Sequence, residues 1–158
     1  MERGDAAAKT WLEGIQKNEP RVYPKNTPIV AAVGAGEIDV GFVNHYYLYR
    51  FKTDAGTFNA SNHFLGGGDP GALVNVAGTG ILNSSKHVGA AKKLIEYLLS
   101  PKAQRYFATG VKEYPLIPSV SSHEDLVPLS EIETPDVDLS NLDDLKGTLK
   151  LLQDAGVL

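Results

Sequence analysis

Two adjacent tyrosines lie where the chain is expected to pass from a strand into a helix. They belong to the run Asn44-His45-Tyr46-Tyr47, which directly follows a segment rich in β-branched residues at 38–43. Inside a regular helix, adjacent side chains diverge by about 100°, so two neighbouring phenols would not share one ion. At a strand-to-helix junction the backbone bends, and both phenols can turn toward one cleft. Open α/β sheets bind their ligands at such junctions, beyond the carboxyl ends of the strands.

Paired phenols suit a small cation of high charge. Fe(III) prefers anionic oxygen ligands, and a phenol whose free pKa is about 10 loses its proton on binding such an ion. The amide groups of Asn26 and Asn44, together with the free N–H groups of a helix N-terminus, can hold a small anion that completes the metal shell. The alternative for Tyr46 and Tyr47 is aromatic packing at the start of a helix, with one ring buried. The tyrosine pair taken alone favours packing.

Helices and short strands are expected to alternate around this junction. The apolar spacing predicts helices at 5–18, 29–33, 44–50, 88–99 and 101–107, and a last helix that begins at Ser140. Asp5, Thr27 and Ser140 are expected to cap the N-termini of their helices. Strands are expected at 38–43, 62–65 and 72–82, and the proline-rich segment 114–137 is expected to wrap a surface. The alternation predicts an α/β architecture.

Composition excludes several classes of function. The formal net charge is −4 and the 15 basic residues are scattered, so nucleic acid is not the expected partner. The absence of cysteine excludes disulfides and thiolate metal sites. The glycine pairs at 34–36 and 78–80 lack the lysine of a phosphate-binding loop. An enzyme with Tyr46 or Tyr47 as general base would need a catalytic partner, and the sequence supplies no recognisable one.

Four runs of residues together resemble the bacterial ferric-ion-binding proteins of ABC importers, in order along the chain. These runs are 22–30, 36–47, 69–78 and 98–107, and the similarity extends over essentially the whole sequence. The resemblance implies part of a two-lobed, type II periplasmic binding protein, truncated to its C-terminal half. It assigns residues 1–75 to the second lobe, 76–127 to a segment that returns to the first lobe, and 128–158 to a tail helix packed on the second lobe.

The resemblance also implies the chemistry of the site. Tyr46 and Tyr47 become the paired phenolate ligands of Fe(III), and Asn26 and Asn44 help to hold a synergistic anion, phosphate or carbonate. The expected partner of the whole protein is a membrane permease of the ABC class, and the expected location is the periplasm or the outer face of a membrane. The first residues contain no apolar signal core, so the alternatives are a cytoplasmic protein or one whose signal has been removed.

Members of this family are about twice as long as this chain, and their other half supplies further iron ligands. Strands left without partners would expose sheet edges, which predicts a dimer, a domain-swapped assembly or a rearranged single domain. Two rival functions remain open. One is binding of another small solute, such as a polyamine, thiamine or a phosphonate. The other is a folded fragment that retains the tyrosines without full binding activity.

Overall fold

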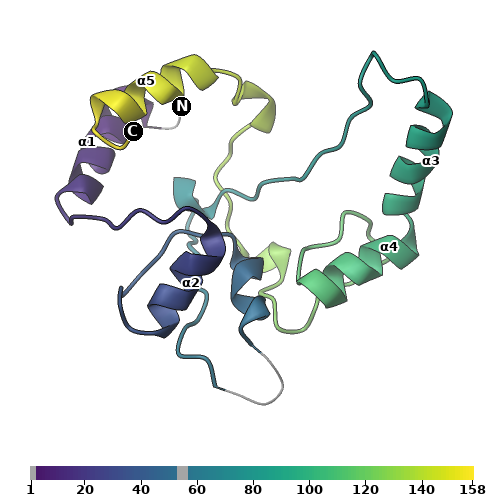
Figure 1. Ribbon diagram of the computed structural model, residues 1–158, viewed down its shortest axis with the longest axis horizontal. Coiled ribbons are helices and arrows are strands. Elements are labelled where there is room, and N and C mark those ends of the chain that lie inside the picture. The colour runs from purple at the N-terminus through teal and green to yellow at the C-terminus, as the bar shows by residue number, and fades with distance from the viewer. Residues whose placement is uncertain (1–2, 53–56) are drawn as a thin grey trace. The chain divides into compact units, whose positions relative to one another are not determined.

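The computed structural model describes residues 3–52 and 57–158, and Figure 1 shows their elements. The chain divides into two compact units, each formed by segments that are separate in the sequence. Unit 1 contains the chain up to Pro24, Leu65–Asn75 and Glu133–Leu158, and unit 2 contains Lys25–Phe64 and Val76–Ile132. The α-helices are α1 (Gly4–Gln16), α2 (Asn26–Gly34), α3 (Val88–Leu98), α4 (Pro101–Tyr106) and α5 (Leu145–Asp154). The 3-10 helices are η1 (His45–Arg50), η2 (Pro70–Ala72), η4 (Leu129–Glu131) and η5 (Leu139–Asn141), and η3 (Phe107–Val111) is a π-helical turn.

Unit 1 brings the first and last helices together, with α1 packed against α5 (Figure 1). The Gln16 side chain at the end of α1 donates a hydrogen bond of 2.9 Å to the carbonyl of Gly156, just beyond α5. The helix predicted at 5–18 is confirmed, but Asp5 does not cap it. Because α1 begins at Gly4, Asp5 lies in the first turn, where its negative charge still complements the helix dipole.

The start of α5 also differs from the prediction. Ser140 lies in η5, where its backbone N–H and its hydroxyl both donate to the Asp138 carboxylate, at 2.9 and 2.7 Å. These bonds hold the pKa of Asp138 below its ordinary value. The helix begins later, at Leu145, and Asp144 caps it by accepting from the Gly147 N–H at 2.8 Å. Competition from an earlier acidic turn therefore displaces the cap from Ser140.

In unit 2, α2 packs against η1, and the buried side chains of these helices are Val30 and Ala32 on α2 and Leu48 on η1. The helix predicted at 29–33 is confirmed and begins earlier, at Asn26. Thr27 is consequently inside the helix rather than at its cap, which is Lys25. Pro28 lies in the first turn, where backbone N–H groups have no hydrogen-bond partner within the helix. The missing N–H of proline therefore breaks no helical hydrogen bond there.

The helices α3 and α4 follow the predicted ranges closely. The Ser100 hydroxyl accepts from the Ala103 N–H at 3.4 Å, and Pro101 occupies the first helical position. Gln104 on α4 is buried, and both ends of its amide are used. Its nitrogen donates to the Leu98 carbonyl at 2.8 Å, and its oxygen accepts from the Leu116 N–H at 2.7 Å. This side chain therefore ties the proline-rich segment to the helices.

The predicted strands are absent from residues 3–52 and 57–158. The segments at 38–43 and 62–65 run without regular secondary structure there, and so does 72–82 after Ala72, which ends η2. β-branched residues favour an extended backbone, but a strand forms only when a second segment completes its hydrogen-bond ladder. No described segment does so here, and the predicted α/β class is therefore not confirmed by the structure.

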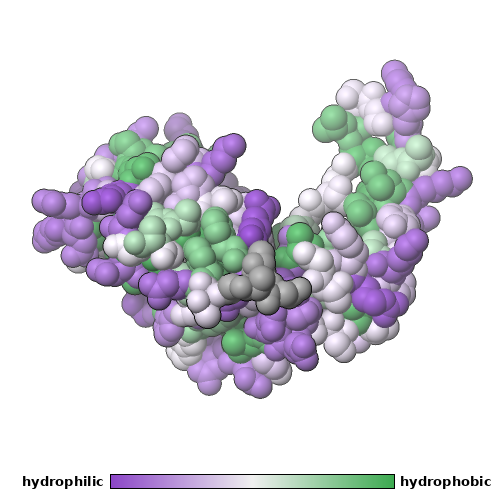
Figure 2. Space-filling view, turned by 60° about the horizontal axis from the view of Figure 1, so that its bottom comes forward, coloured by the Kyte–Doolittle hydropathy of each residue, from purple (hydrophilic) through white to green (hydrophobic). Residues whose placement is uncertain are grey.

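The buried core of the described residues is small. It is formed mainly by short side chains, with Val30, Leu48, Val120 and Leu126 the larger members. Many large apolar side chains remain exposed, and Figure 2 shows apolar residues spread over the face that it draws. Within the part of the chain described, no helix has both the length and the apolar character needed to cross a bilayer.

Gly34 at the end of α2 gives a test of this packing. A β-carbon at Gly34 would overlap Cζ of Phe58, a ring that also stacks on Phe51. We expect Gly34→Ala to lower the free energy of unfolding by about 1–3 kcal/mol, because the added methyl overpacks the site. Gly14 in α1 has open space around it, so Gly14→Ala is expected to add about 0.5–1 kcal/mol. Urea denaturation of both variants checks the opposite signs, and equal effects would contradict them.

Candidate functional site

The tyrosine pair lies on η1, directly after Asn44, whose backbone is extended. In a 3-10 helix, successive side chains are about 120° apart, so adjacent rings are not held together by helix geometry. The rings of Tyr46 and Tyr47 nevertheless have centroids 4.7 Å apart and planes 35° apart. Both side chains are half-buried rather than enclosed in separate apolar packing. The two phenols therefore share one location at the surface of unit 2.

Hydrogen bonds join the phenols to both predicted asparagines. The Asn44 amide nitrogen donates to the Tyr46 hydroxyl at 3.0 Å. Tyr46 and Tyr47 share a side-chain hydrogen bond, and Asn26 forms another with the Tyr47 oxygen. The first residue of α2 and the start of η1 thus bring all four predicted site residues together. In this arrangement the Asn44 amide nitrogen is hydrogen-bonded to the Tyr46 hydroxyl.

The two phenols have different acidities. The hydrogen bond from Asn26 lowers the pKa of Tyr47, and the bond from Tyr46 and the charge of Arg50 act in the same direction. Burial raises the pKa of Tyr46 and outweighs the opposing hydrogen bond from Asn44. Tyr47 is therefore the phenol that loses its proton first, with Tyr46 as a donor beside it.

Arg50 also stabilises the Tyr47 phenolate, a role that was not predicted from the sequence. Its guanidinium carbon lies 4.7 Å from the centroid of the Tyr47 ring. A cation over an aromatic face is attracted by the ring, and it is attracted more strongly when that ring carries a phenolate. The spacing of Tyr47 and Arg50 at i and i+3 on a predicted helix was the available signal.

His45 also takes a defined place. Its Nε2 lies 2.7 Å from the carbonyl oxygen of Lys112, away from the hydrogen bonds between the phenols. Its ring is part-buried and contacts the rings of Tyr46 and Tyr114.

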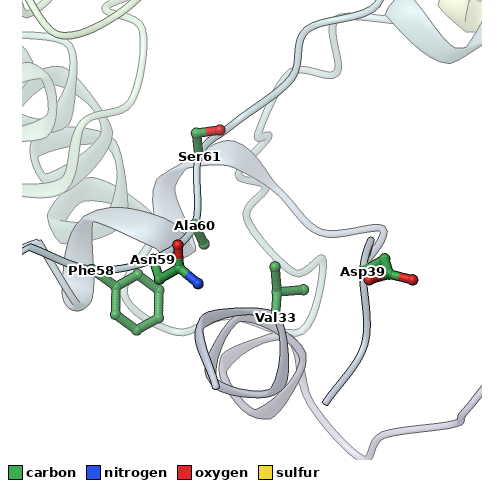
Figure 3. A pocket seen from close by; sticks show the side chains of 6 residues that line it. All are labelled: Val33, Asp39, Phe58, Asn59, Ala60 and Ser61. Atoms are coloured by element: carbon green, nitrogen blue, oxygen red, sulfur yellow. The ribbon is translucent and has the colours of Figure 1, made fainter. Parts of the chain in front are cut away.

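A separate cavity of about 440 Å³ lies elsewhere in unit 2 and shares no lining residue with the phenol pair. Val33, Asp39 and residues 58–61 line it, and Figure 3 shows Val33 between the Phe58 ring and Asp39. Asp39 is the only carboxylate among the described residues that line it. Across residues 3–52 and 57–158, no three His, Cys, Asp or Glu side chains form a cluster that could hold a metal. The phenol pair is therefore the better candidate for a cation.

The hydrogen bond from Asn26 can be tested directly. Without this donor, the Tyr47 phenolate loses its main stabilising contact, so Asn26→Ala is expected to raise the pKa of Tyr47. Spectrophotometric titration of tyrosinate, with Tyr47→Phe as reference to identify the signal, measures the shift. Asn83→Ala, at an exposed turn, is the matched control and should leave the titration unchanged. A titration of Asn26→Ala identical to that of the parent chain would contradict the assignment.

Comparison with known proteins places these features in a family. The family of bacterial extracellular solute-binding proteins matches residues 2–134. The major ferric iron-binding protein of Neisseria meningitidis serogroup B is 36% identical over 98% of this chain and 47% of its own length. The Fe(3+)-binding periplasmic protein of Serratia marcescens is 32% identical over 99% of this chain and 46% of its own length.

A solved structure agrees with these relatives. The crystal structure of iron-bound HitA from Pseudomonas aeruginosa superimposes with a TM-score of 0.85 and 34% sequence identity, covering 94% of this chain and 48% of that one. The chain thus spans about half the length of the relatives it matches, and its fold corresponds to part of such a structure. It belongs to the bacterial extracellular solute-binding proteins, a family of binding proteins rather than of enzymes.

Proposed function

We propose that this chain supplies half of a ferric-iron-binding protein that delivers its cargo to an ABC permease from outside the cytoplasmic membrane. The observation that carries the proposal is the pair of phenols held side by side with Asn26 and Asn44. Relatives named as iron-binding proteins, at 32–36% identity, support the same cargo. Delivery to the permease is a property of the whole protein.

The ligand chemistry follows from the difference between the phenols. Tyr47, with its lowered pKa, binds Fe(III) first as the phenolate. Burial raises the pKa of Tyr46, and the charge of the ion would lower it, so that this phenol also releases its proton to solvent on binding. Because each phenol releases a proton on binding, the affinity for iron rises with pH. Two phenolates leave coordination positions for an anion and for ligands outside this chain.

The proposed anion, phosphate or carbonate, lies between Asn26, Asn44 and the N-terminus of α2. The helix begins at Asn26, so its first-turn N–H groups have no helical partner and face that end. Asn44 is engaged by Tyr46 in the free chain. When the metal takes the phenol oxygen, the amide nitrogen of Asn44 becomes available to the anion.

The exposed surface supports association with further protein. Large apolar side chains of both units are exposed, among them Val22 at 92%, Val40 at 79% and Leu82 at 77%. We propose that the strands of an α/β architecture form only when this surface is covered, by the remainder of a two-lobed protein or by a second copy in a dimer or domain swap. Residues 1–75 and 128–158 would then belong to the second lobe and 76–127 to the first.

Titration with ferric citrate tests the cargo. Phenolate ligands give a visible phenolate-to-metal absorption band, and we expect this band to saturate at one iron per chain. The absence of a band, with calorimetric binding of spermidine, thiamine or a phosphonate, would favour the rival solutes. A band that disappears at a small excess of citrate would indicate a fragment that retains the tyrosines but lacks the other ligands.

A further inference from the structure

We propose that His45 is a positioning residue that fixes the orientation of the tyrosine pair. It precedes Tyr46 at the start of η1 and contacts two other segments of unit 2. The inference rests on the proposed function, because the group whose position it sets is the phenol pair. It concerns hydrogen bonds and packing around the pair, and it assigns no metal ligand to His45.

The first contact joins the ring of His45 to the turn that ends η3. Nε2 lies 2.7 Å from the Lys112 carbonyl oxygen, and because a carbonyl only accepts, Nε2 carries the proton and donates it. Lys112 has a φ of 60°, in the left-handed region that closes the π-helical turn. The carbonyl is therefore held by the conformation of its own turn, and the imidazole is held in one tautomer.

The second contact fixes the backbone of the same residue. The Asn62 side-chain nitrogen donates to the His45 carbonyl at 3.0 Å, in a part-buried location. His45 is thus bound at its ring by one segment and at its main chain by another. A residue held at both ends leaves the start of η1 little freedom to rotate about its axis.

Ring contacts transmit this restraint to the phenols. The imidazole meets the Tyr46 ring edge-to-face, with centroids 5.5 Å apart and planes at 77°. On its other sides it packs against Phe64 at 5.9 Å and Tyr114 at 5.4 Å. Rotation of the imidazole would displace Tyr46, and with it the ring of Tyr47 that lies 4.7 Å beyond. Both phenol oxygens must meet one ion, so a small rotation of η1 costs affinity.

Two substitutions at His45 separate the donor from the ring. His45→Gln retains an amide N–H able to reach the Lys112 carbonyl, whereas His45→Phe retains an aromatic ring and loses the donor. His63→Phe makes the same exchange at an exposed histidine and is the matched control. The readouts are ferric affinity by citrate competition, the position of the phenolate band, and the urea midpoint of the iron-free chain.

We expect His45→Phe to weaken ferric binding by about 10–100-fold and to shift the band, as for loss of a residue that orients a ligand. His45→Gln keeps the donor to Lys112 but loses the ring that contacts Tyr46, so it should bind iron more tightly than His45→Phe and less tightly than the parent chain. His63→Phe should match the parent chain. The proposal is overturned if His45→Phe lowers only the urea midpoint, or if His45→Gln loses as much affinity as His45→Phe.

An iron-independent measurement keeps this inference distinct from the proposed function. If the parent chain binds no iron, the proposed function fails, but the orientation of the phenols is still observable in the free protein. Nuclear Overhauser contacts between selectively labelled Tyr46 and Tyr47 rings should be present in the parent chain and in His45→Gln, and lost in His45→Phe. Unchanged contacts in His45→Phe would overturn the positioning role.

Discussion

Replacing Tyr47 with phenylalanine is expected to lower the ferric affinity of the chain by more than about 100-fold and to remove most of the visible band. The substitution deletes the phenol whose pKa the Asn26 hydrogen bond lowers, and with it the first anionic ligand that the ion meets. The expected loss exceeds the roughly 10–100-fold effect typical of residues that only orient a ligand. Citrate competition followed by visible absorption measures both quantities.

The matched control is Tyr106→Phe, the same exchange at a largely exposed tyrosine on α4. It should leave affinity and spectrum unchanged. Tyr46→Phe should keep a weaker band from the single remaining phenolate, and the double variant should show none. A Tyr47→Phe chain that binds ferric ion as tightly as the parent would remove the phenol pair from consideration as the metal site.

Leu48→Ala is the substitution with the largest expected effect on stability. Leu48 is 3% exposed and lies in η1 between Tyr47 and Tyr49, where that helix packs against α2. Truncation of a buried leucine creates a cavity and costs about 2–5 kcal/mol. We expect the urea midpoint of the chain to fall accordingly, and the contact between Asn26 and Tyr47 to weaken because it spans the same two helices.

Leu94→Ala is the matched control, because it removes the same side-chain atoms from an exposed leucine. Leu94 lies on α3 and is 58% exposed, so its truncation should change the free energy of unfolding by less than about 0.5 kcal/mol. If the two truncations lower the free energy of unfolding by the same amount, the contact between α2 and η1 does not form a core in solution. A large effect at Leu94 alone would instead indicate that the α3 face is covered by another chain.

The helices were largely predictable because their signals are local. The apolar periodicity of α1 and α3 and the Ser100-Pro101 start of α4 lie within single stretches of sequence. Capping was less predictable, since Ser140 and Asp144 both offer side-chain acceptors and the helix starts at the later one. Strands were predicted from composition alone. Their formation depends on a pairing segment, which no local pattern reveals.

The sequence identified the four candidate residues of the site but not all the contacts around them. The ligand candidates selected were Tyr46 and Tyr47 for the metal and Asn26 and Asn44 for the anion. The structure brings these four residues together, while their roles toward metal and anion stay predictions. The contributions of Arg50 and of the Lys112 carbonyl were missed. The second of these depends on a left-handed residue 67 positions beyond His45, and a contact of that sequence separation has no signal in a single chain.

The division of the chain between the two units has a practical consequence for dissecting this molecule. The backbone passes from one unit to the other after Pro24, Phe64, Asn75 and Ile132. No single cut therefore releases either unit as a continuous polypeptide, and a protease nick at one passage leaves three covalent links in place. A chain that ended at Ile132 would lack α5 and leave α1 without the helix on which it packs. Domain exchange between relatives would need four junctions chosen together.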